Sequence, residues 1–232
     1  MIEHVVPAAV STRAAYGAEL DDAPLFPEEA GAVAKAVAKR RAEYAAGRAC
    51  ARTALSALGI PPGPILRDTE RGAPIWPDGV VGSITHCDGY RAAAVARTPD
   101  ILTLGIDAEP HGPLPDGVLD VILATPHERA SLAALTAQAP QVRWDRLLFS
   151  AKETVYKAWY PFHRRMLDFK SAELLFTPDE SEDPGHGGYT ARLLVPGPLL
   201  TDELRLAHFS GRYLARDGFV VTAITVQHDD VK

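Results

Sequence analysis

The residues predict that one order of elements, a long helix followed by strands, occurs twice along the 232 residues. The first helix is expected over 28–58, because Pro27 and two glutamates favour its start and Gly59 followed by Pro61 favours its end. Three strands should follow and form an antiparallel meander. They are expected at 79–85, 91–96 and 101–107.

The second half predicts the same order. Thr125 and Glu128 form a capping box with Pro126 at the first helical position, so a helix is expected from there to about residue 138. A second helix is expected over 142–160. Strands are expected at 171–177, 189–195, 204–213 and 219–227, with a mobile loop at 178–188. We therefore predict an α+β protein of two similar lobes, 1–108 and 109–232, each a small, mainly antiparallel sheet packed with a long helix.

Composition limits the classes of function. No apolar run approaches the roughly 20 residues of a membrane span, and the N-terminus lacks a signal core, so a cytoplasmic protein without a membrane partner is expected. Cys50 and Cys87 do not have the C-x-x-C spacing of metal ligands or redox pairs. They also give no disulfide framework, which suits a reducing compartment. The formal net charge of −6 argues against nucleic acid as a partner.

Two acidic residues, Asp107 and Glu109, stand one apart where the apolar run 101–106 ends. Alternate residues of a strand point to the same side, so these carboxylates should project together. Glu153, on a predicted helix, could complete an oxygen site for Mg²⁺, an ion that commonly also binds substrate phosphates. The plain alternatives are solvated acids at a strand end and an exposed ion pair between Glu153 and Lys157.

Aromatic and basic residues argue for a cleft that binds anions. Phe149, Tyr156 and Tyr160 flank Glu153 on the helical wheel, which indicates a cleft rather than open solvent. Arg40 falls inside the apolar stripe of the first helix, where an unpaired guanidinium is costly, so an anionic partner is expected.

A hydroxyl and an imidazole stand together at a predicted strand-to-turn junction. Thr85 and His86 could hold a phosphate there with backbone N–H groups. A solvated basic helix and a structural histidine are the alternatives for Arg40 and His86.

Four segments, taken in order, resemble the Sfp-type 4′-phosphopantetheinyl transferases. They are 71–77 (RGAPIWP), 82–87 (GSITHC), 105–109 (GIDAE) and 150–157 (SAKETVYK). The chain looks most like the actinobacterial branch, which serves fatty-acid, polyketide and siderophore synthases. The resemblance implies a monomer whose two pseudo-twofold α+β lobes bind coenzyme A and Mg²⁺ between them. Members transfer the 4′-phosphopantetheine arm of coenzyme A to a serine of an apo acyl or peptidyl carrier protein, releasing adenosine 3′,5′-bisphosphate.

The resemblance also implies roles for individual residues. The metal would be held by Asp107, Glu109 and Glu153, and Mn²⁺ is possible in place of Mg²⁺. Coenzyme A would be contacted by Arg40, Arg48, Arg67, Arg71, Thr85 and His86, with Asp107, Lys152, Glu153 and Lys157 at its diphosphate. Our hypothesis is that Glu153, directly or through a metal-bound water, takes the serine proton, while Lys157 stabilises or protonates the leaving phosphate.

Two other classes of function compete with this interpretation. A metal-dependent nuclease could use the same acids with Lys157, but it predicts a strongly basic surface, and the chain is acidic overall. A non-catalytic module that binds carrier proteins or coenzyme A would not need all three acids and Lys157. An apolar patch for carrier docking is expected in the second lobe near the helix that starts at Thr125.

Overall fold

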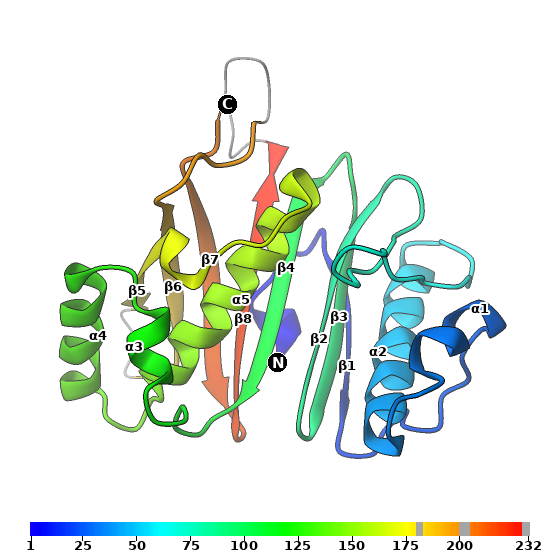
Figure 1. The fold of residues 1–232 in the computed structure, drawn as a ribbon, viewed down its shortest axis with the longest axis horizontal. Coiled ribbons are helices and arrows are strands. Elements are labelled where there is room, and N and C mark those ends of the chain that lie inside the picture. The colour runs from blue at the N-terminus through cyan, green and yellow to red at the C-terminus, as the bar shows by residue number, and fades with distance from the viewer. Residues whose placement is uncertain (180–182, 200–204, 229–232) are drawn as a thin grey trace.

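The computed structural model, which describes residues 1–179, 183–199 and 205–228, contains two antiparallel sheets that stand side by side (Figure 1). A three-stranded sheet has the order β1-β3-β2 and a five-stranded sheet has the order β4-β8-β7-β6-β5. Each sheet packs with one long helix, so the predicted α+β class with two lobes is confirmed.

The first lobe packs helix α2 (Ala38–Ala57) against its sheet. Its strands are β1 (Ser11–Tyr16), β2 (Val80–Cys87) and β3 (Tyr90–Arg97). The hairpin between β2 and β3 was predicted, whereas β1 was missed, because its residues STRAAY lack a clear alternation of apolar and polar side chains. Shorter elements precede α2: η1 (Ile2–His4), α1 (Pro27–Ala30) and η2 (Gly31–Val33).

The second lobe packs helix α5 (Trp144–His163) across its sheet. Its strands are β4 (Ile101–Pro110), β5 (Ala172–Pro178), β6 (His186–Leu193), β7 (His208–Arg216) and β8 (Phe219–Gln227). Its other helices are α3 (Val118–Ile122), α4 (Pro126–Gln138) and η3 (Phe169–Ser171). The α4 start is as predicted, because the Thr125 hydroxyl accepts a hydrogen bond from the Glu128 amide at 3.0 Å.

The single helix predicted over 28–58 is wrong. Val37 has extended backbone and lies outside α2, with 73% of its surface exposed, so it does not join the predicted apolar stripe. The buried Glu29 carboxylate accepts hydrogen bonds from Arg52 at 3.0 Å and from the Ile65 amide at 2.8 Å. These bonds fold α1 back against α2, so the two helices are not collinear.

The predicted meander is also wrong in its third strand. Strand β4 leaves the first sheet and pairs with β8, and the lobe boundary predicted between residues 108 and 109 falls inside β4. Part of the predicted loop 178–188 and the start of the predicted strand 204–213 lie outside the described residues, and β6 already begins at His186.

Hydrophobic contacts join the lobes into one body. One buried cluster includes Tyr90 and Ala92 of the first sheet together with Ile106 of β4 and Val221 of β8. The N-terminal residues Met1 and Ile2 belong to the same cluster. Among the described residues, none of the helices is both long and apolar enough to cross a bilayer.

Candidate functional site

The seam between the lobes is formed by β2 and β4, which are joined through side chains. The Ile106 amide donates to Ser83 Oγ at 3.1 Å, and the Ala108 amide donates to Thr85 Oγ1 at 3.1 Å. The Thr85 hydroxyl in turn donates to Asp107 Oδ1 at 3.2 Å. Thr85, predicted as a phosphate contact, therefore positions β4, the strand that carries Asp107 and Glu109, and is itself buried.

A cleft of about 390 Å³ lies at this seam and brings together six of the predicted site residues. The residues that line it are Ile84, Thr85, His86, Asp107, Glu109, Phe149, Glu153 and Lys157. They come from β2, β4 and α5, which are far apart in the sequence.

Helix α5 can reach this cleft because Gly105 has no side chain. A Cβ atom at Gly105 would lie 2.5 Å from the Thr154 carbonyl oxygen and 2.9 Å from the Ala158 nitrogen, both backbone atoms of α5. Hydroxyl contacts of 2.9 Å from Ser150 and 2.6 Å from Thr154 to Thr222 tie the same helix to β8. The close packing sets the depth at which Glu153 and Lys157 face Asp107.

Cationic side chains hold the two acids of β4. Lys157 Nζ lies 2.7 Å from Asp107 Oδ1 and also donates to the Ile106 carbonyl at 2.9 Å. Arg146 Nη1 lies 3.0 Å from Glu109 Oε2. The sequence interpretation missed Arg146, although it stands seven residues before Glu153 and so near the same face of α5.

Burial and like charge govern the electrostatics of the cleft. Burial raises the pKa of Glu153, Lys157 opposes this shift, and the neighbouring Asp107 adds to it. Burial also raises the pKa of Glu109, again with a contribution from Asp107. Burial is therefore the main cause of both shifts, and at Glu109 the ion pair with Arg146 offsets only part of it.

The carboxylates fit a divalent cation by their chemistry. Asp107 Oδ2 is buried without a hydrogen-bond partner, and Glu153 has no hydrogen-bond or ion-pair partner within residues 1–179, 183–199 and 205–228. Carboxylate oxygens are the ligands that Mg²⁺ prefers. Over the same described residues, no three His, Cys, Asp or Glu side chains converge closely enough to form a metal site. The three acids therefore line one cleft without forming a close cluster. Two of them, Asp107 and Glu109, form ion pairs with Lys157 and Arg146.

Arg40 and His86 meet at the rim of the cleft. Arg40 Nη1 lies 2.5 Å from His86 Nε2 and 3.6 Å from Glu43 Oε2, which is the anionic partner predicted for Arg40. Arg40 is nevertheless half-exposed rather than inside an apolar stripe. Burial, followed by the charge of Arg40, lowers the pKa of His86.

Arg71 lines a second cleft of about 580 Å³, which shares Ile84 and Lys157 with the first. One wall is the segment from Asp68 to Trp76, and the other includes Tyr156 and Tyr160 of α5. Together the two clefts run along the seam between the lobes.

Arg48 and Arg67 lie outside the lining of both clefts. Arg48 is buried, donates through Nε to the Ile65 carbonyl at 2.9 Å and stacks 4.2 Å from the Tyr44 ring. Burial lowers the pKa of its guanidinium. Arg67 folds over its own loop and donates to the Gly72 carbonyl at 3.2 Å.

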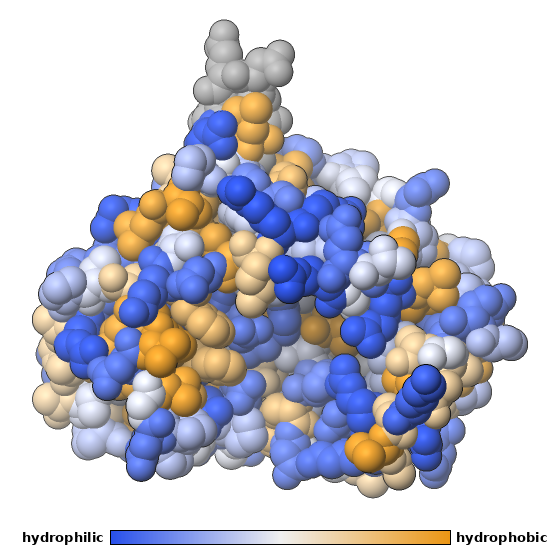
Figure 2. All heavy atoms as spheres, in the orientation of Figure 1, coloured by the Kyte–Doolittle hydropathy of each residue, from blue (hydrophilic) through white to orange (hydrophobic). Residues whose placement is uncertain are grey.

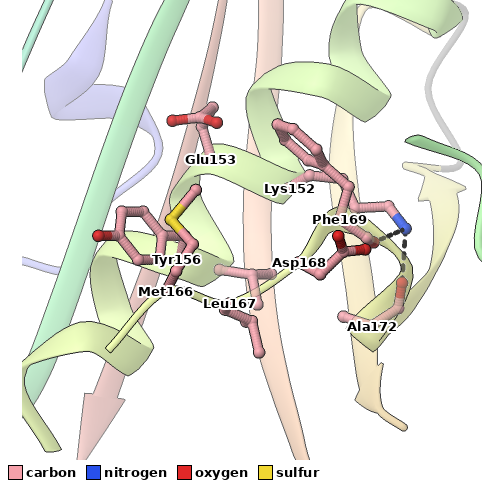
Figure 3. Close-up of a pocket in the computed structure, with 9 residues that line it drawn as sticks. Lys152, Glu153, Tyr156, Met166, Leu167, Asp168, Phe169 and Ala172 are labelled. Atoms are coloured by element: carbon pink, nitrogen blue, oxygen red, sulfur yellow. Dashed lines mark hydrogen bonds between the residues drawn. The ribbon is translucent and has the colours of Figure 1, made fainter. Parts of the chain in front are cut away.

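Lys152, predicted to support the diphosphate, has its amine in the core of the second lobe. Figure 3 shows Lys152 and Glu153 leaving α5 in different directions, with the Lys152 amine bonded to the carbonyls of Phe169 and Ala172. The same amine lies 2.9 Å from Glu128 Oε1, and both side chains are 1% exposed. The structure therefore separates Lys152 from the cleft residues.

Comparisons with known proteins give two matching family models. Residues 28–96 match the model of the 4′-phosphopantetheinyl transferase N-terminal domain, and residues 103–195 match that of the 4′-phosphopantetheinyl transferase superfamily.

Three bacterial proteins are similar over nearly the whole chain. The 4′-phosphopantetheinyl transferase Svp of Streptomyces mobaraensis is 56% identical over 97% of this chain and 89% of its own length. Npt of Nocardia iowensis is 48% identical over 97% of this chain and 99% of its own length. PptT of Mycobacterium tuberculosis is 44% identical, with coverages of 97% and 98%.

Proposed function

The chain belongs to the 4′-phosphopantetheinyl transferase superfamily and transfers the phosphopantetheine arm of coenzyme A to carrier proteins, and we propose that it does so at the cleft between β2, β4 and α5. The observation that carries the proposal is the meeting of Asp107, Glu109, Glu153 and Lys157 in that cleft. Transfer from a diphosphate needs charge neutralisation and a base, and this set of side chains can serve both needs.

Asp107, Glu109 and Glu153 would hold Mg²⁺ or Mn²⁺. When bound, such an ion supplies charge neutralisation at the diphosphate oxygens. The unpartnered Oδ2 of Asp107 and the unpaired Glu153 support this assignment among the described residues. Lys157 and Arg146 keep the β4 acids oriented toward the cleft through their ion pairs.

Glu153 and Lys157 carry the proton transfers in our proposal. Glu153 takes the proton of the carrier serine as its oxygen forms the new bond to the phosphorus that bears the pantetheine arm. The bond from that phosphorus to the bridging oxygen of the diphosphate breaks, and the leaving group is adenosine 3′,5′-bisphosphate. Lys157, one turn further along α5, stabilises or protonates that departing phosphate.

The arginines would anchor the nucleotide end of coenzyme A. Arg40 and His86 stand together at the rim of the first cleft, and Arg71 stands at the second. Each offers N–H donors suited to phosphate. Arg48 and Arg67 would support these residues indirectly, because their guanidinium groups donate hydrogen bonds to the backbone carbonyls of Ile65 and Gly72.

An apolar surface on the second lobe suits the carrier protein. Figure 2 shows hydrophobic residues gathered on the face that carries α3 and α5. Val121 of α3 is 62% exposed and Met166, after α5, is 54% exposed. We propose that carriers of fatty-acid, polyketide and siderophore synthases dock here. A monomeric state and a cytoplasmic location stay predictions from the sequence.

Intact mass spectrometry tests the function directly. The protein is incubated with coenzyme A, MgCl₂ and an apo carrier protein, and the carrier should gain the mass of one phosphopantetheine arm. Asp107→Asn and Glu153→Gln should each abolish the gain while circular dichroism shows that the variant is folded at the assay temperature, and EDTA should also abolish it until Mg²⁺ or Mn²⁺ is restored. Near-normal labelling by either variant would remove that residue from the mechanism.

A further inference from the structure

We propose, resting on the proposed function for the role of Arg71, that Tyr160 is a positioning residue for coenzyme A. Its hydroxyl fastens the loop Asp68–Pro74 of the first lobe, which carries Arg71, to helix α5 of the second lobe. The two residues that form the bond are 92 positions apart in the sequence.

The loop is organised around the Asp68 carboxylate. Asp68 Oδ1 accepts hydrogen bonds from three consecutive amides, those of Arg71 at 2.8 Å, Gly72 at 2.7 Å and Ala73 at 3.2 Å. The Asp68 amide closes the loop by donating to the Ala73 carbonyl at 2.8 Å. Gly72 adopts a φ of 75°, a conformation that glycine reaches without strain. Arg71 therefore has its backbone held by Asp68, whereas its side chain is exposed.

The second carboxylate oxygen of Asp68 binds the other lobe. The Tyr160 hydroxyl donates to Asp68 Oδ2 at 2.6 Å, and Tyr160 is only 4% exposed. Arg164, which follows α5, lies 3.7 Å from the same oxygen. The Tyr160 hydroxyl also lies 3.4 Å from Glu70 Oε2 of the same loop, so the contact with Asp68 is the shorter of the two. The Asp68 carboxylate joins the Arg71 loop to the end of α5, and we call this contact the interlobe latch.

The latch stands on the same face of α5 as the proposed catalytic residues. Glu153, Lys157 and Tyr160 have the spacing i, i+4 and i+7, which places them along one stripe of a helix. A single rigid helix therefore sets the distance from the metal end of the site to the Arg71 loop. In the proposed function the diphosphate lies at the Glu153 and Lys157 end of that stripe and Arg71 binds the nucleotide at the other end, so a misplaced loop should weaken coenzyme A binding more than the chemical step.

The protonation states suit a permanent latch. Burial and the hydrogen bond to Asp68 raise the pKa of Tyr160 to about 12, so the phenol remains a donor at neutral pH. Burial pushes the pKa of Asp68 upward, but the bonds from Tyr160 and the three loop amides outweigh it and hold that pKa below its ordinary value.

Tyr160→Phe tests the latch because it removes one oxygen atom and keeps the ring. Coenzyme A KM, and the coenzyme A Kd from calorimetry, should each rise about three- to tenfold, while kcat changes less than about twofold. Asp68→Asn should shift KM in the same direction. Tyr213→Phe is the matched control, since its hydroxyl bonds the Pro184 carbonyl at 3.2 Å within the second lobe, and it should leave KM unchanged.

A double-mutant cycle shows whether Tyr160 acts through Arg71. In an Arg71→Ala background, Tyr160→Phe should add less than about twofold to KM, because the loop no longer carries the contact. Two results would overturn the proposal. One is a full additional rise in the coenzyme A KM when Tyr160→Phe is made in the Arg71→Ala background. The other is a lower melting temperature with an unchanged KM in the Tyr160→Phe single variant. Absence of labelling by the wild-type protein would instead refute the proposed function, so the two failures are distinguishable.

Discussion

Lys152 offers the sharpest test of the structure, because the sequence and the fold assign it to different places. The resemblance puts it at the diphosphate, whereas the structure surrounds its amine with Glu128 at 2.9 Å and the carbonyls of Phe169 and Ala172 at 2.9 and 2.5 Å. Burial lowers the pKa of Lys152, and Glu128 opposes that shift. The fold thus keeps the Lys152–Glu128 pair in its core.

Lys152→Ala should therefore destabilise the fold. It leaves the Glu128 carboxylate buried without its cation, and breaking such a pair typically costs about 3–5 kcal/mol. Glu128 keeps two amide donors, from Ala124 and Leu174, each at 2.6 Å, which places the loss toward the lower end of that range. For a loss of about 3–4 kcal/mol, at about 2–4 °C per kcal/mol for a chain of this size, the melting temperature should fall by about 6–16 °C.

Thermal unfolding followed by circular dichroism measures this loss, and coenzyme A KM is measured well below the lowered midpoint. The exposed Lys170→Ala is the control and should change stability by no more than about 0.5 kcal/mol. A Lys152→Ala variant that melts like the wild type but raises the coenzyme A KM more than tenfold would put the amine in the cleft and refute its placement in the core.

Three further predictions follow from the packing and the charges. Gly105→Ala should lower both stability and transfer rate, since its Cβ would meet α5 backbone at 2.5 Å; an unaltered rate in the labelling assay would contradict the close approach. Glu29→Gln should cost about 2–4 kcal/mol in urea unfolding, because Arg52 loses its buried partner, and a loss below about 0.5 kcal/mol would speak against it. The hydrogen bond from Thr125, with help from Arg192, lowers the pKa of Glu173. The ionised Glu173 carboxylate therefore stabilises the fold at pH values above its pKa in the unfolded chain, about 4.3, and this stabilisation is lost as pH falls through the lower pKa of the folded state. The stability gap between wild type and Glu173→Gln should accordingly close in acid titrations, and a gap that widens there would reverse the assigned sign.

Much of the site could be predicted because its residues stand in short, local patterns. Asp107 and Glu109 alternate on a strand, and Glu153 and Lys157 share a helical face, so their common direction follows from backbone periodicity alone. The aromatic residues beside Glu153 also indicated a cleft, and Phe149 does line it. The arginines were harder, since a long side chain can turn toward its own loop, as Arg67 does over Gly72.

Other features depend on contacts that no local pattern contains. Arg146 was missed, although it bonds Glu109 and the carbonyl of Gly112, because an arginine on a helix is usually solvated. Lys152 and Glu153 are neighbours in the sequence, yet successive residues of a helix point about 100° apart, so one enters the core and the other the cleft.

The sequence by itself determined the class of fold, the family and the acids that gather at the seam, because periodicity and motif order are properties of the chain alone. Only the tertiary structure decided which sheet receives β4, where the helix after Pro27 breaks, and which cations face which acids. Those outcomes depend on partners that are far apart in the sequence, such as Val221 opposite Ala108 within the five-stranded sheet and Asp68 opposite Tyr160 across the two lobes, which only the folded chain brings together.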